Sequence, residues 1–399
     1  MKKLLLLGGS NFLLPVIKEA HELGLYVVTC DYLPDNTAHR YSDEYRNVSI
    51  IDKDAVLALA AELGIAGVMS FACDPGVVTA AYVAERLGLP SAGSYEAVSI
   101  LQNKGRFRKF LADNGFNVPR ARSYHSAGEA LRDAEGLPWP VIVKPVDSAG
   151  SKGVSRADDI SQLAEALRRA EACSICGDVI IEEFIEKQGE STDSDCFSVD
   201  GRLCYAAFDD QLFDADAENP YTPAAYSWPS SMPQWAQDAL RAELQRLMTL
   251  LGLGSSLYNI ETRLGKNGRP YIMEVSPRGG GNRLSEVQHM ASGVNLIRSA
   301  VKAAVCMPVD ELRDPVYSGC WSEVILHGDD DGAFRELWID ENVRPYVAQT
   351  DLWLSPGDRV ERFTGANKAV GTLVLNFPTR RELDMRMADM SWHKVLIDK

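Results

Sequence analysis

The chain has 399 residues, of which 46% are hydrophobic and 24% are charged, a composition typical of a soluble globular protein. Its 56 acidic residues exceed its 41 basic residues, and the formal net charge of −15 argues against nucleic acid or an anionic membrane as a partner. This length predicts roughly two to four domains or subdomains.

The first residues resemble the start of a signal peptide, but the apolar run ends at Gly8-Gly9-Ser10 and predicts a buried first strand. No apolar stretch reaches the roughly 20 residues that span a bilayer. The eight cysteines are scattered, and Cys173 and Cys176 form one close pair without a second pair or a histidine cluster to complete a zinc site. We therefore expect free thiols in a reducing compartment and a cytoplasmic location.

Strand-like and helix-like segments alternate through residues 1–93, which predicts an N-terminal open α/β domain with a mostly parallel sheet. The predicted strands cover residues 3–7, 26–30 and 67–71, and the predicted helices cover 12–23, 54–63 and 75–87. The turn after the first strand suits an anion because it opens a helix. It lacks the spaced glycines of a dinucleotide site, so a nicotinamide-dependent oxidoreductase ranks low.

The rest of the chain predicts four further parts. Residues 94–119 read as a connecting helix, 120–199 as a small α+β module, 200–310 as a central antiparallel-sheet part and 311–399 as a mixed C-terminal module. In the central part, the segment before a clear helix at 233–251 has few regular signals, so we expect loops around a site there. Further helices are expected at 284–290 and 294–305, and strands near 321–326 and 371–377.

Two acidic side chains face each other in a predicted hairpin whose turn is Asn267-Gly268, the strongest short hairpin signal. If Lys266 pairs with Arg269, counting outward sets Glu261 opposite Glu274, with Cβ atoms about 5 Å apart on one face. Facing carboxylates repel, and a divalent cation such as Mg²⁺ removes that penalty. The alternative is a solvated hairpin whose charges point at water.

A lysine ends an apolar strand just before a loop of small residues. Lys144 precedes the segment from Asp147 to Gly153, where glycines and serines let backbone N–H groups approach a phosphate and the lysine adds a point charge. The segment does not match the phosphate loop of P-loop proteins. By itself it would also fit an ordinary turn.

Taken in order, these signals resemble the ATP-grasp superfamily, which includes D-alanine–D-alanine ligase, biotin carboxylase, carbamoyl phosphate synthetase and the L-amino acid ligases. The resemblance covers roughly residues 1–310. The motifs that carry it are Lys104, Lys144 with its loop, Ile-Ile-Glu-Glu-Phe-Ile at 180–185 with Gly189-Glu190, Asn-Ile-Glu261, and Met-Glu274-Val-Ser-Pro-Arg278-Gly-Gly-Gly. It implies an ATP-grasp fold with the α+β module of residues 120–199 as the ATP lid.

The resemblance also implies an ATP site. Lys104 and Lys144 would bind the phosphates and the adenine edge, and the loop with Ser148, Gly150, Ser151 and Gly153 would close over the phosphates. The strand that ends in Glu182, Glu183, Phe184 and Ile185 would form the adenine hinge, with the Glu183 carbonyl and the Ile185 N–H reading the base. Glu190 would bind the ribose hydroxyls. Glu261 and Glu274 would hold Mg²⁺ (or Mn²⁺), and Arg278 would steady the transferred phosphoryl group.

The sequence departs from the family pattern at one metal position. The family usually has Asn two residues after the second metal glutamate, and Ser276 stands there. The same pairing count sets Asn259 opposite Ser276. We hypothesise that Asn259, or a water held by Ser276, supplies the missing metal contact.

The reaction implied is that of a carboxylate–amine ligase, in which a carboxylate attacks the γ-phosphate of ATP and an amine then displaces phosphate from the acyl-phosphate. Arg278 and Arg283 are our candidates for the substrate carboxylate because the guanidinium fork suits it. Two alternatives stay open, namely a bicarbonate-using carboxylase or carbamoyl-phosphate-type enzyme and a non-catalytic nucleotide-binding module. Residues 311–399 would either complete the substrate pocket or form a homodimer contact.

Overall fold

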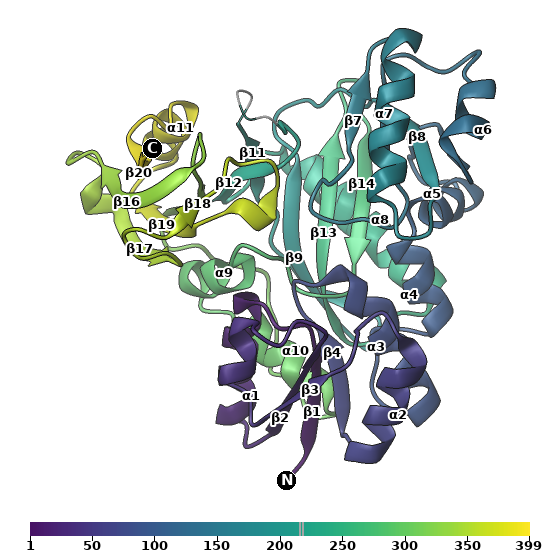
Figure 1. The fold of residues 1–399 in the computed structure, drawn as a ribbon, viewed down its shortest axis with the longest axis vertical. Coiled ribbons are helices and arrows are strands. Elements are labelled where there is room, and N and C mark those ends of the chain that lie inside the picture. Colours follow the sequence, from purple (N-terminus) through teal and green to yellow (C-terminus); the bar gives the residue numbers. More distant parts are fainter. Residues whose placement is uncertain (215–216, 218) are drawn as a thin grey trace.

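The computed structural model describes residues 1–214, 217 and 219–399. The N-terminal unit is a parallel sheet in the order β3-β2-β1-β4 with helices packed on it (Figure 1). Its elements are β1 Lys3–Leu7, α1 Leu14–Glu22, β2 Tyr26–Asp31, β3 Glu44–Asn47, α2 Lys53–Leu63, β4 Gly67–Ser70 and α3 Asp74–Leu87, with short 3₁₀ turns at Asn11–Leu13 and Thr37–Arg40. The leucines of β1 are fully buried, as expected of a parallel strand covered on both faces, and the predicted α/β domain is confirmed.

The single connecting helix predicted for residues 94–119 is wrong, because the chain forms two helices there. They are α4 Tyr95–Gln102 and α5 Lys104–Asp113. Asn103 has an extended backbone between them, and its side-chain oxygen accepts a 3.0 Å hydrogen bond from the Arg106 N–H. Asparagine is among the best N-cap residues, so it starts a new helix here and sets Lys104 in its first turn.

The lid unit is a four-stranded sheet in the order β5-β8-β6-β7 that carries two helices and forms the upper right of Figure 1. Its elements are β5 Ala121–Tyr124, α6 Ala127–Arg132, β6 Val141–Pro145, β7 Ser155–Ala157, α7 Ile160–Cys173 and β8 Val179–Glu183. Alternate apolar residues of β6, Val141 and Val143, pack with Leu163 and Leu167 of α7 in one core. The predicted α+β character is confirmed, but the sheet ends at Glu183, and residues 192–199 of the predicted 120–199 module form a strand of the central sheet instead.

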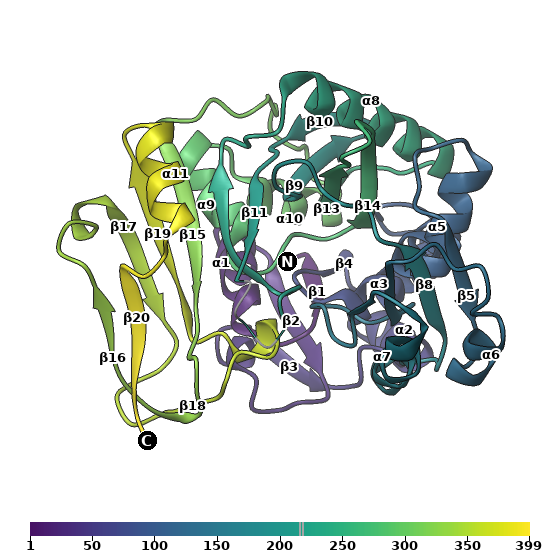
Figure 2. The ribbon, with the colours of Figure 1, turned by 90° about the horizontal axis from the view of Figure 1, so that it is seen from above.

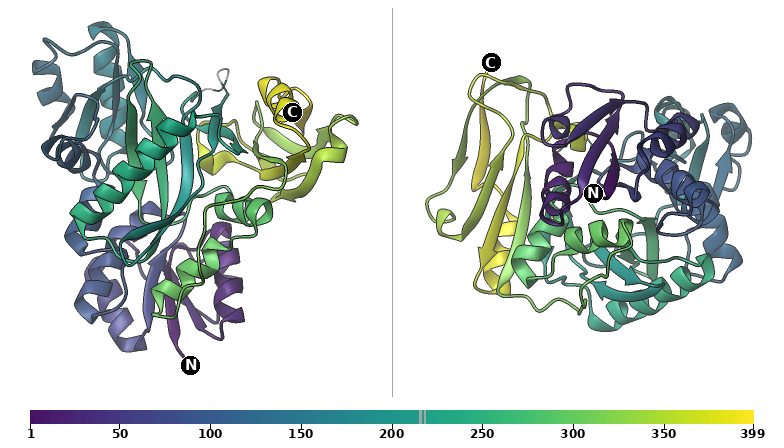
Figure 3. Two further views of the ribbon diagram at one scale, coloured as in Figure 1. Left: turned by 180° about the vertical axis from the view of Figure 1, so that it is seen from behind. Right: turned by 90° about the horizontal axis from the view of Figure 1, so that it is seen from below.

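The central unit is a second four-stranded sheet, in the order β10-β9-β13-β14, with α8 lying along one face (Figures 2 and 3). Its elements are β9 Thr192–Val199, β10 Arg202–Ala206, α8 Gln234–Leu251, β13 Ser256–Leu264 and β14 Pro270–Ser276. Large apolar residues of α8, among them Leu240, Leu244 and Leu247, fill the core beneath the sheet. On the other face, Phe197 and Leu257 pack with Leu296 in a second core, whereas Glu261 and Glu274 line a cavity shared with the lid.

The β13–β14 hairpin places Glu261 opposite Glu274 and Asn259 opposite Ser276, as predicted. The predicted two-residue turn is wrong. The Gly265 N–H donates to the Arg269 carbonyl at 2.9 Å, so the loop between them has three residues and ends in Gly268 at a positive φ of 74°. The register returns to the predicted count because β14 has a bulge at Met273, where Thr262 pairs with Ile272 and Glu261 with Glu274.

The C-terminal unit is a five-stranded sheet in the order β11-β12-β15-β19-β17, and a three-stranded sheet, β18-β16-β20, packs beside it. The strands are β11 Asp210–Phe213, β12 Pro223–Trp228, β15 Cys320–Leu326, β16 Gly332–Ile339, β17 Val347–Leu352, β18 Arg359–Val360, β19 Gly371–Phe377 and β20 His393–Asp398. The helices are α9 Leu284–Ser292, α10 Leu296–Ala304 and α11 Arg380–Ala388, with 3₁₀ turns at Arg344–Tyr346 and Ala366–Lys368.

The loops expected before residue 233 are partly wrong, because β10, β11 and β12 lie there. The strand β12 pairs with β15 almost a hundred residues later, with Trp228 opposite Trp321. Such long-range pairing leaves little local signal, since β-propensity depends on cross-strand neighbours. This sheet joins strands from both sides of residue 310, and the domain boundaries themselves stay a prediction. None of the described helices is long and apolar enough to cross a membrane.

Candidate active site

One cavity lies between the lid sheet and the central sheet. Its walls come from α5, β6 and its following loop, β8, β11, β13 and β14. Most residues predicted for the nucleotide line it, namely Lys104, Lys144, Ser148, Gly150, Ser151, Glu182, Glu183, Phe184, Ile185, Glu261 and Glu274. The fold thus gathers in one place groups that are spread over about 170 positions of the sequence.

Two buried lysines mark one end of the cavity. Lys104 Nζ donates to the Ser148 carbonyl at 2.9 Å and lies 3.4 Å from Glu274 Oε2. Lys144 Nζ lies 2.8 Å from Glu182 Oε2. Burial lowers the pKa of Lys144, as do the charges of Arg108 and Lys104, while Glu182 opposes them. Both amines therefore already have a carboxylate neighbour, and both line the cavity, where a phosphate could also reach them.

Glu182 was predicted as part of the adenine hinge, and its carboxylate is instead directed at two cations. Arg108 Nε lies 2.9 Å from Glu182 Oε1, and both side chains are almost fully buried. Burial alone would raise the pKa of Glu182, but Arg108 and Lys144 outweigh it and lower the pKa to about 2. Arg108 Nη1 also donates to the Met273 carbonyl at 2.7 Å. This hydrogen bond gives the carbonyl of the bulge residue in β14 a partner. The carboxylate of Glu182 therefore links Arg108 of α5 to Lys144 of the lid, and Arg108 in turn contacts the central sheet.

The predicted lid loop is held by hydrogen bonds to Asn219 and Tyr221. Ser151 Oγ donates to the Tyr221 carbonyl at 2.8 Å, and Asn219 Nδ2 donates to the Ser151 carbonyl at 3.2 Å. Gly150, Ser151 and Gly153 all have positive φ, the region where glycine is least strained. Gly153 itself does not line the cavity and packs against α7, where a Cβ atom would lie 2.8 Å from Cys173 Cβ.

The end of β8 forms the cavity wall opposite the loop. Phe184 N–H donates to the Pro140 carbonyl at 3.1 Å, and Arg263 Nη1 donates to the Ile185 carbonyl at 3.1 Å. The guanidinium carbon of Arg156 lies 4.5 Å from the centre of the Phe184 ring. The hinge is thereby fixed from both sides, and reading of the base by Glu183 and Ile185 stays a prediction.

The paired carboxylates Glu261 and Glu274 open into the cavity, with about a third of each side chain exposed. Burial raises the pKa of Glu261, and the charge of Glu274 raises it further while Arg263 opposes. The repulsion expected from the sequence is therefore present. Two accessible carboxylates beside two lysines are a donor set that fits Mg²⁺, which is usually held by one or two carboxylates plus substrate phosphates.

The second predicted pair of metal ligands lies on the same sheet face but is already hydrogen-bonded. Gln102 Nε2 donates to Ser276 Oγ at 2.8 Å, and Ser276 Oγ donates to Asp74 at 2.6 Å. Asn259 Oδ1 accepts from Arg278 at 2.9 Å, and Asn259 Nδ2 donates to Asp195 at 3.3 Å. Metal contacts by Asn259 or Ser276 would require rearrangement of this network, and they stay a hypothesis.

The two predicted substrate arginines lie outside the nucleotide cavity. Arg278 binds Asp74 through a fork, with Nε and Nη2 at 2.9 and 2.8 Å from its two oxygens, and joins the N-terminal unit to the central sheet. Arg283 lies in a separate groove between α1, α9 and β17, where its guanidinium contacts Gln349 at 3.0 Å and Glu286 at 3.2 Å. Their contact with a substrate carboxylate stays a prediction.

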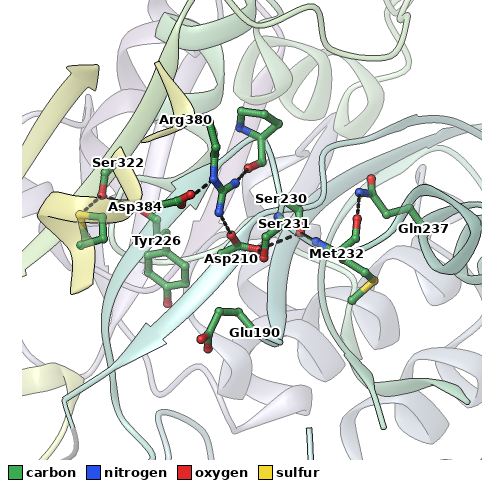
Figure 4. Close-up of polar contacts among 12 residues, drawn as sticks. Glu190, Asp210, Tyr226, Ser230, Ser231, Met232, Gln237, Ser322, Arg380 and Asp384 are labelled. Atoms are coloured by element: carbon green, nitrogen blue, oxygen red, sulfur yellow. Dashed lines mark hydrogen bonds and ion pairs between the residues drawn. The ribbon is translucent and has the colours of Figure 1, made fainter. Parts of the chain in front are cut away.

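Glu190 lies in a neighbouring groove that shares Phe184 and Tyr221 with the nucleotide cavity. It is ion-paired with Lys187. Figure 4 shows its side chain near Asp210, which accepts from Arg380 of α11 at 2.7 Å. The ribose role of Glu190 stays a prediction, and it would require the ribose to extend toward this groove.

Sequence reasoning missed three residues that shape the site. Arg108 follows Lys104 by four positions, the spacing that puts both on one helix face. Arg263 follows Glu261 by two, the spacing of one strand face. Asp193 lies on β9 directly opposite Glu261. The first two could have been found from spacing, whereas Asp193 needed the pairing of β9 with β13.

Comparison with known proteins agrees with this geometry. A family model described as an ATP-grasp domain matches residues 137–286. The formate-dependent phosphoribosylglycinamide formyltransferase of Synechococcus sp. (strain CC9311) is 27% identical over 285 residues, which is 69% of this chain and 70% of that protein.

Solved structures share the fold over the whole chain. The L-amino acid ligase of Bacillus licheniformis superposes with a TM-score of 0.82 and 22% identity, covering 100% of this chain and 99% of that one. The biotin carboxylase of Campylobacter jejuni gives 0.72 and 15%, with 100% and 92% covered. Residues 137–286 therefore carry an ATP-grasp domain, and the chain as a whole shares its fold with these enzymes.

Proposed function

We propose that the protein is an ATP- and Mg²⁺-dependent carboxylate–amine ligase that works through an acyl-phosphate and releases ADP and phosphate. The observation that carries this proposal is the convergence of Lys104 and Lys144 with the carboxylate pair Glu261 and Glu274 in one cavity under a glycine-containing loop. Cations for phosphates and carboxylates for a metal lie side by side, and Lys104 touches Glu274 at 3.4 Å.

In this proposal the lid sheet and the central sheet hold ATP between them. Lys104 and Lys144 bind the phosphates, and the 148–153 loop covers them and excludes water from the reaction. Glu261 and Glu274 hold Mg²⁺, which when bound offsets negative charge on the phosphates. The fixed positions of the lysines, tied to the Ser148 carbonyl and to Glu182, let them stabilise developing charge without reorganisation.

The bond changes of the proposed reaction balance as follows. A carboxylate oxygen attacks the γ-phosphorus of ATP, the bond from that phosphorus to the β–γ bridging oxygen breaks, and ADP leaves. The amine nitrogen then attacks the acyl carbon, the bond to the phosphate oxygen breaks, and phosphate leaves. The amine loses its proton to solvent or to phosphate, and an amide remains.

Names of related proteins support a small carboxylate and a small amine as substrates. One relative is described as formate-dependent, and one protein of the same fold is an L-amino acid ligase. Bicarbonate is the second candidate for the carboxylate, because the same fold covers the whole of this chain in a biotin carboxylase. In that case the product would be a carboxylated amine.

The test is release of ADP and phosphate from MgATP against a panel of single carboxylates, bicarbonate, and carboxylate–amine pairs. We expect release that needs one carboxylate and one amine together. Release with bicarbonate alone would favour the second candidate. Tight binding of ATP without release on any mixture would contradict both and leave a nucleotide-binding module.

A further inference from the structure

The sheet face that carries the proposed metal pair continues beyond it. Asp193 of β9 lies opposite Glu261 of β13, which lies opposite Glu274 of β14. Residues opposite one another in a ladder share a face, so the three carboxylates form one row across the sheet. Lys104 lies at the Glu274 end, 3.4 Å from it, and Asp193 lies at the other end. The row thus runs from the phosphate-binding end toward a region that the nucleotide does not use.

At the Asp193 end the row meets the C-terminal sheet. Tyr226 Oη donates to Asp193 Oδ2 at 3.2 Å. Tyr226 is opposite Glu323 on the adjacent strand, so these two side chains also share a face. Burial raises the pKa of the Tyr226 hydroxyl well above its usual range, and the next largest contributions come from the charges of Asp193, Asp209 and Glu323. The Asp193 N–H donates to Asp209 Oδ1 at 2.7 Å, so Asp193 links Tyr226 to Asp209, and we call Asp193, Asp209 and Glu323 the Tyr226 acidic cluster.

Several buried polar atoms of this region have no hydrogen-bond partner among the described residues. They are Asp209 Oδ2 and both carboxylate oxygens of Glu323, and both side chains are fully buried. A third fully buried group is the amide of Gln288, whose oxygen and nitrogen both lack a partner within the described part of the chain. Buried polar groups in folded proteins are nearly always paired, so an unpaired set in one place points to a missing partner.

Gln288 faces the cluster from the helix that covers it. Leu284, Gln288 and Ala291 of α9 follow the spacing of one helix face. Leu284 and Ala291 pack in the same core as Tyr226, and α9 packs against β15, which carries Glu323. The amide of Gln288 is neutral, so it is evidence for a polar partner that is independent of the carboxylates.

The neighbouring arginines make their hydrogen bonds outside the cluster. Arg278 is held by the fork to Asp74, and Arg283 contacts Glu286 and Gln349. Burial raises the pKa of Asp209 and of Glu323 well above the usual range for a carboxyl, and at Glu323 the charge of Arg283 opposes this only in part. Within the described residues no group of three or more His, Cys, Asp or Glu side chains is arranged to hold a metal ion. An organic ammonium group suits the cluster because it brings both a positive charge and N–H donors to unpaired carboxyl and amide oxygens.

We propose that the amine substrate binds at this cluster through its protonated amino group, on Asp193 and beside Tyr226, with the carboxyls of Asp209 and Glu323 behind them, whose ionised forms the ammonium group would favour. This inference rests on the proposed function and names its amine as a small primary amine. Asp193 is the member of the cluster that is not fully buried, so it is the contact that a ligand reaches. The amine would approach the acyl-phosphate from the side of Glu261 opposite Lys104.

The test is ligand-induced thermal stabilisation of the full chain in the presence of MgADP. The probes are the common L-amino acids and simple alkylamines, each beside its N-acetyl derivative, which lacks the charge. We expect at least one free amine to raise the Tm and its N-acetyl derivative to leave the Tm unchanged. Asp193→Asn and Glu323→Gln should each weaken that amine about tenfold or more, the effect of losing a charged contact, and Glu323→Gln should leave MgADP binding unchanged because Glu323 lies outside the nucleotide cavity.

Glu382→Gln is the matched control, because Glu382 is a partly buried carboxylate on α11 that is ion-paired with Arg386 outside the cluster. It should bind the amine as the wild type does. Equal binding of amines and N-acetyl derivatives, no stabilisation by any amine, or unchanged affinity in both cluster variants would overturn the inference. If the wild type failed to bind MgADP, the proposed function would fail instead, so the two failures are distinguishable. Asp193→Asn keeps the test valid if Glu323→Gln does not fold.

Discussion

The amine of Lys104 lies 3.4 Å from the carboxylate of Glu274, so a candidate phosphate ligand and a candidate metal ligand already touch in the folded chain. Lys104 starts α5, and Glu274 lies in β14 directly after the bulge at Met273. Each group offsets part of the other's charge. Binding of MgATP would replace this contact with a phosphate on the lysine and a metal on the carboxylate.

Removal of one metal carboxylate should abolish activity without unfolding the protein. We expect Glu274→Gln to lower kcat for MgATP-dependent product formation by about a hundredfold or more, because the metal supplies several kcal/mol of charge stabilisation. The Tm should stay close to that of the wild type, since Glu274 is partly exposed and faces Glu261. Unchanged Mg²⁺ dependence of turnover in this variant would show that the carboxylate pair is not the metal site.

Two arginines on α5 should differ sharply in their contribution to stability. Arg108 and its partner Glu182 are nearly fully buried, so Arg108→Ala removes one of the two cations that Glu182 contacts, leaves Lys144, and should cost about 3–5 kcal/mol of unfolding free energy. Arg106 pairs with Glu96 at the surface, and Arg106→Ala should cost about 0–1 kcal/mol. Urea denaturation measures both. Similar costs for the two variants would contradict the role given to Arg108.

The buried Glu182 should make stability depend on pH in the acid range. Its pKa is lowered from the ordinary 4.5 to about 2 by Arg108 and Lys144 despite burial. A carboxyl with a depressed pKa contributes stability that is fully present above its unfolded pKa and is lost as pH falls toward its folded pKa. The difference in unfolding free energy between the wild type and Glu182→Gln should therefore be largest near pH 7 and shrink between about pH 4.5 and pH 2. A difference that stayed constant down to pH 3 would disagree with this ion pair.

Two glycines of the lid loop separate backbone strain from packing. Gly150 and Gly153 have φ of 66° and 73°, so alanine should cost about 1–2 kcal/mol of strain at either position. A Cβ atom at Gly150 meets open space, but at Gly153 it lies 2.8 Å from Cys173 Cβ and 3.1 Å from the Arg169 carbonyl. We expect Gly153→Ala to weaken ATP binding and destabilise the lid more than Gly150→Ala. Calorimetric titration with ATP and thermal unfolding test this, and an equal effect of both would count against the close packing of the loop on α7.

The sequence predicts those site contacts that join residues close to each other in the chain. The Glu261–Glu274 pair could be predicted because both strands belong to one hairpin. The predicted pairing was correct only because an error in the turn length was offset by a bulge that the prediction did not include. The turn has three loop residues where two were expected, and the bulge at Met273 restores the count. A bulge gives no clear sequence signal, so the correct pairing was reached through a partly wrong register.

Residues that act across distant elements could not be predicted in the same way. The Tyr226 acidic cluster needs β9, β12 and β15 to meet, and the segment with β12 was expected to be loop. Ser276 and Asn259 were considered for a metal, but their partners Asp74, Gln102 and Arg278 come from three other parts of the chain. Strand pairing between remote segments decides these contacts, and single-sequence patterns do not report it.

The most direct test of the central claim follows the oxygen atoms. A panel of carboxylates labelled with ¹⁸O is incubated with the enzyme, MgATP and amines, and the released phosphate is analysed by mass spectrometry, with Glu274→Gln as the control. An acyl-phosphate route transfers one labelled oxygen from the carboxylate to each phosphate released, and the variant should release none. Release of ADP with unlabelled phosphate, or no release with any mixture, would contradict the account.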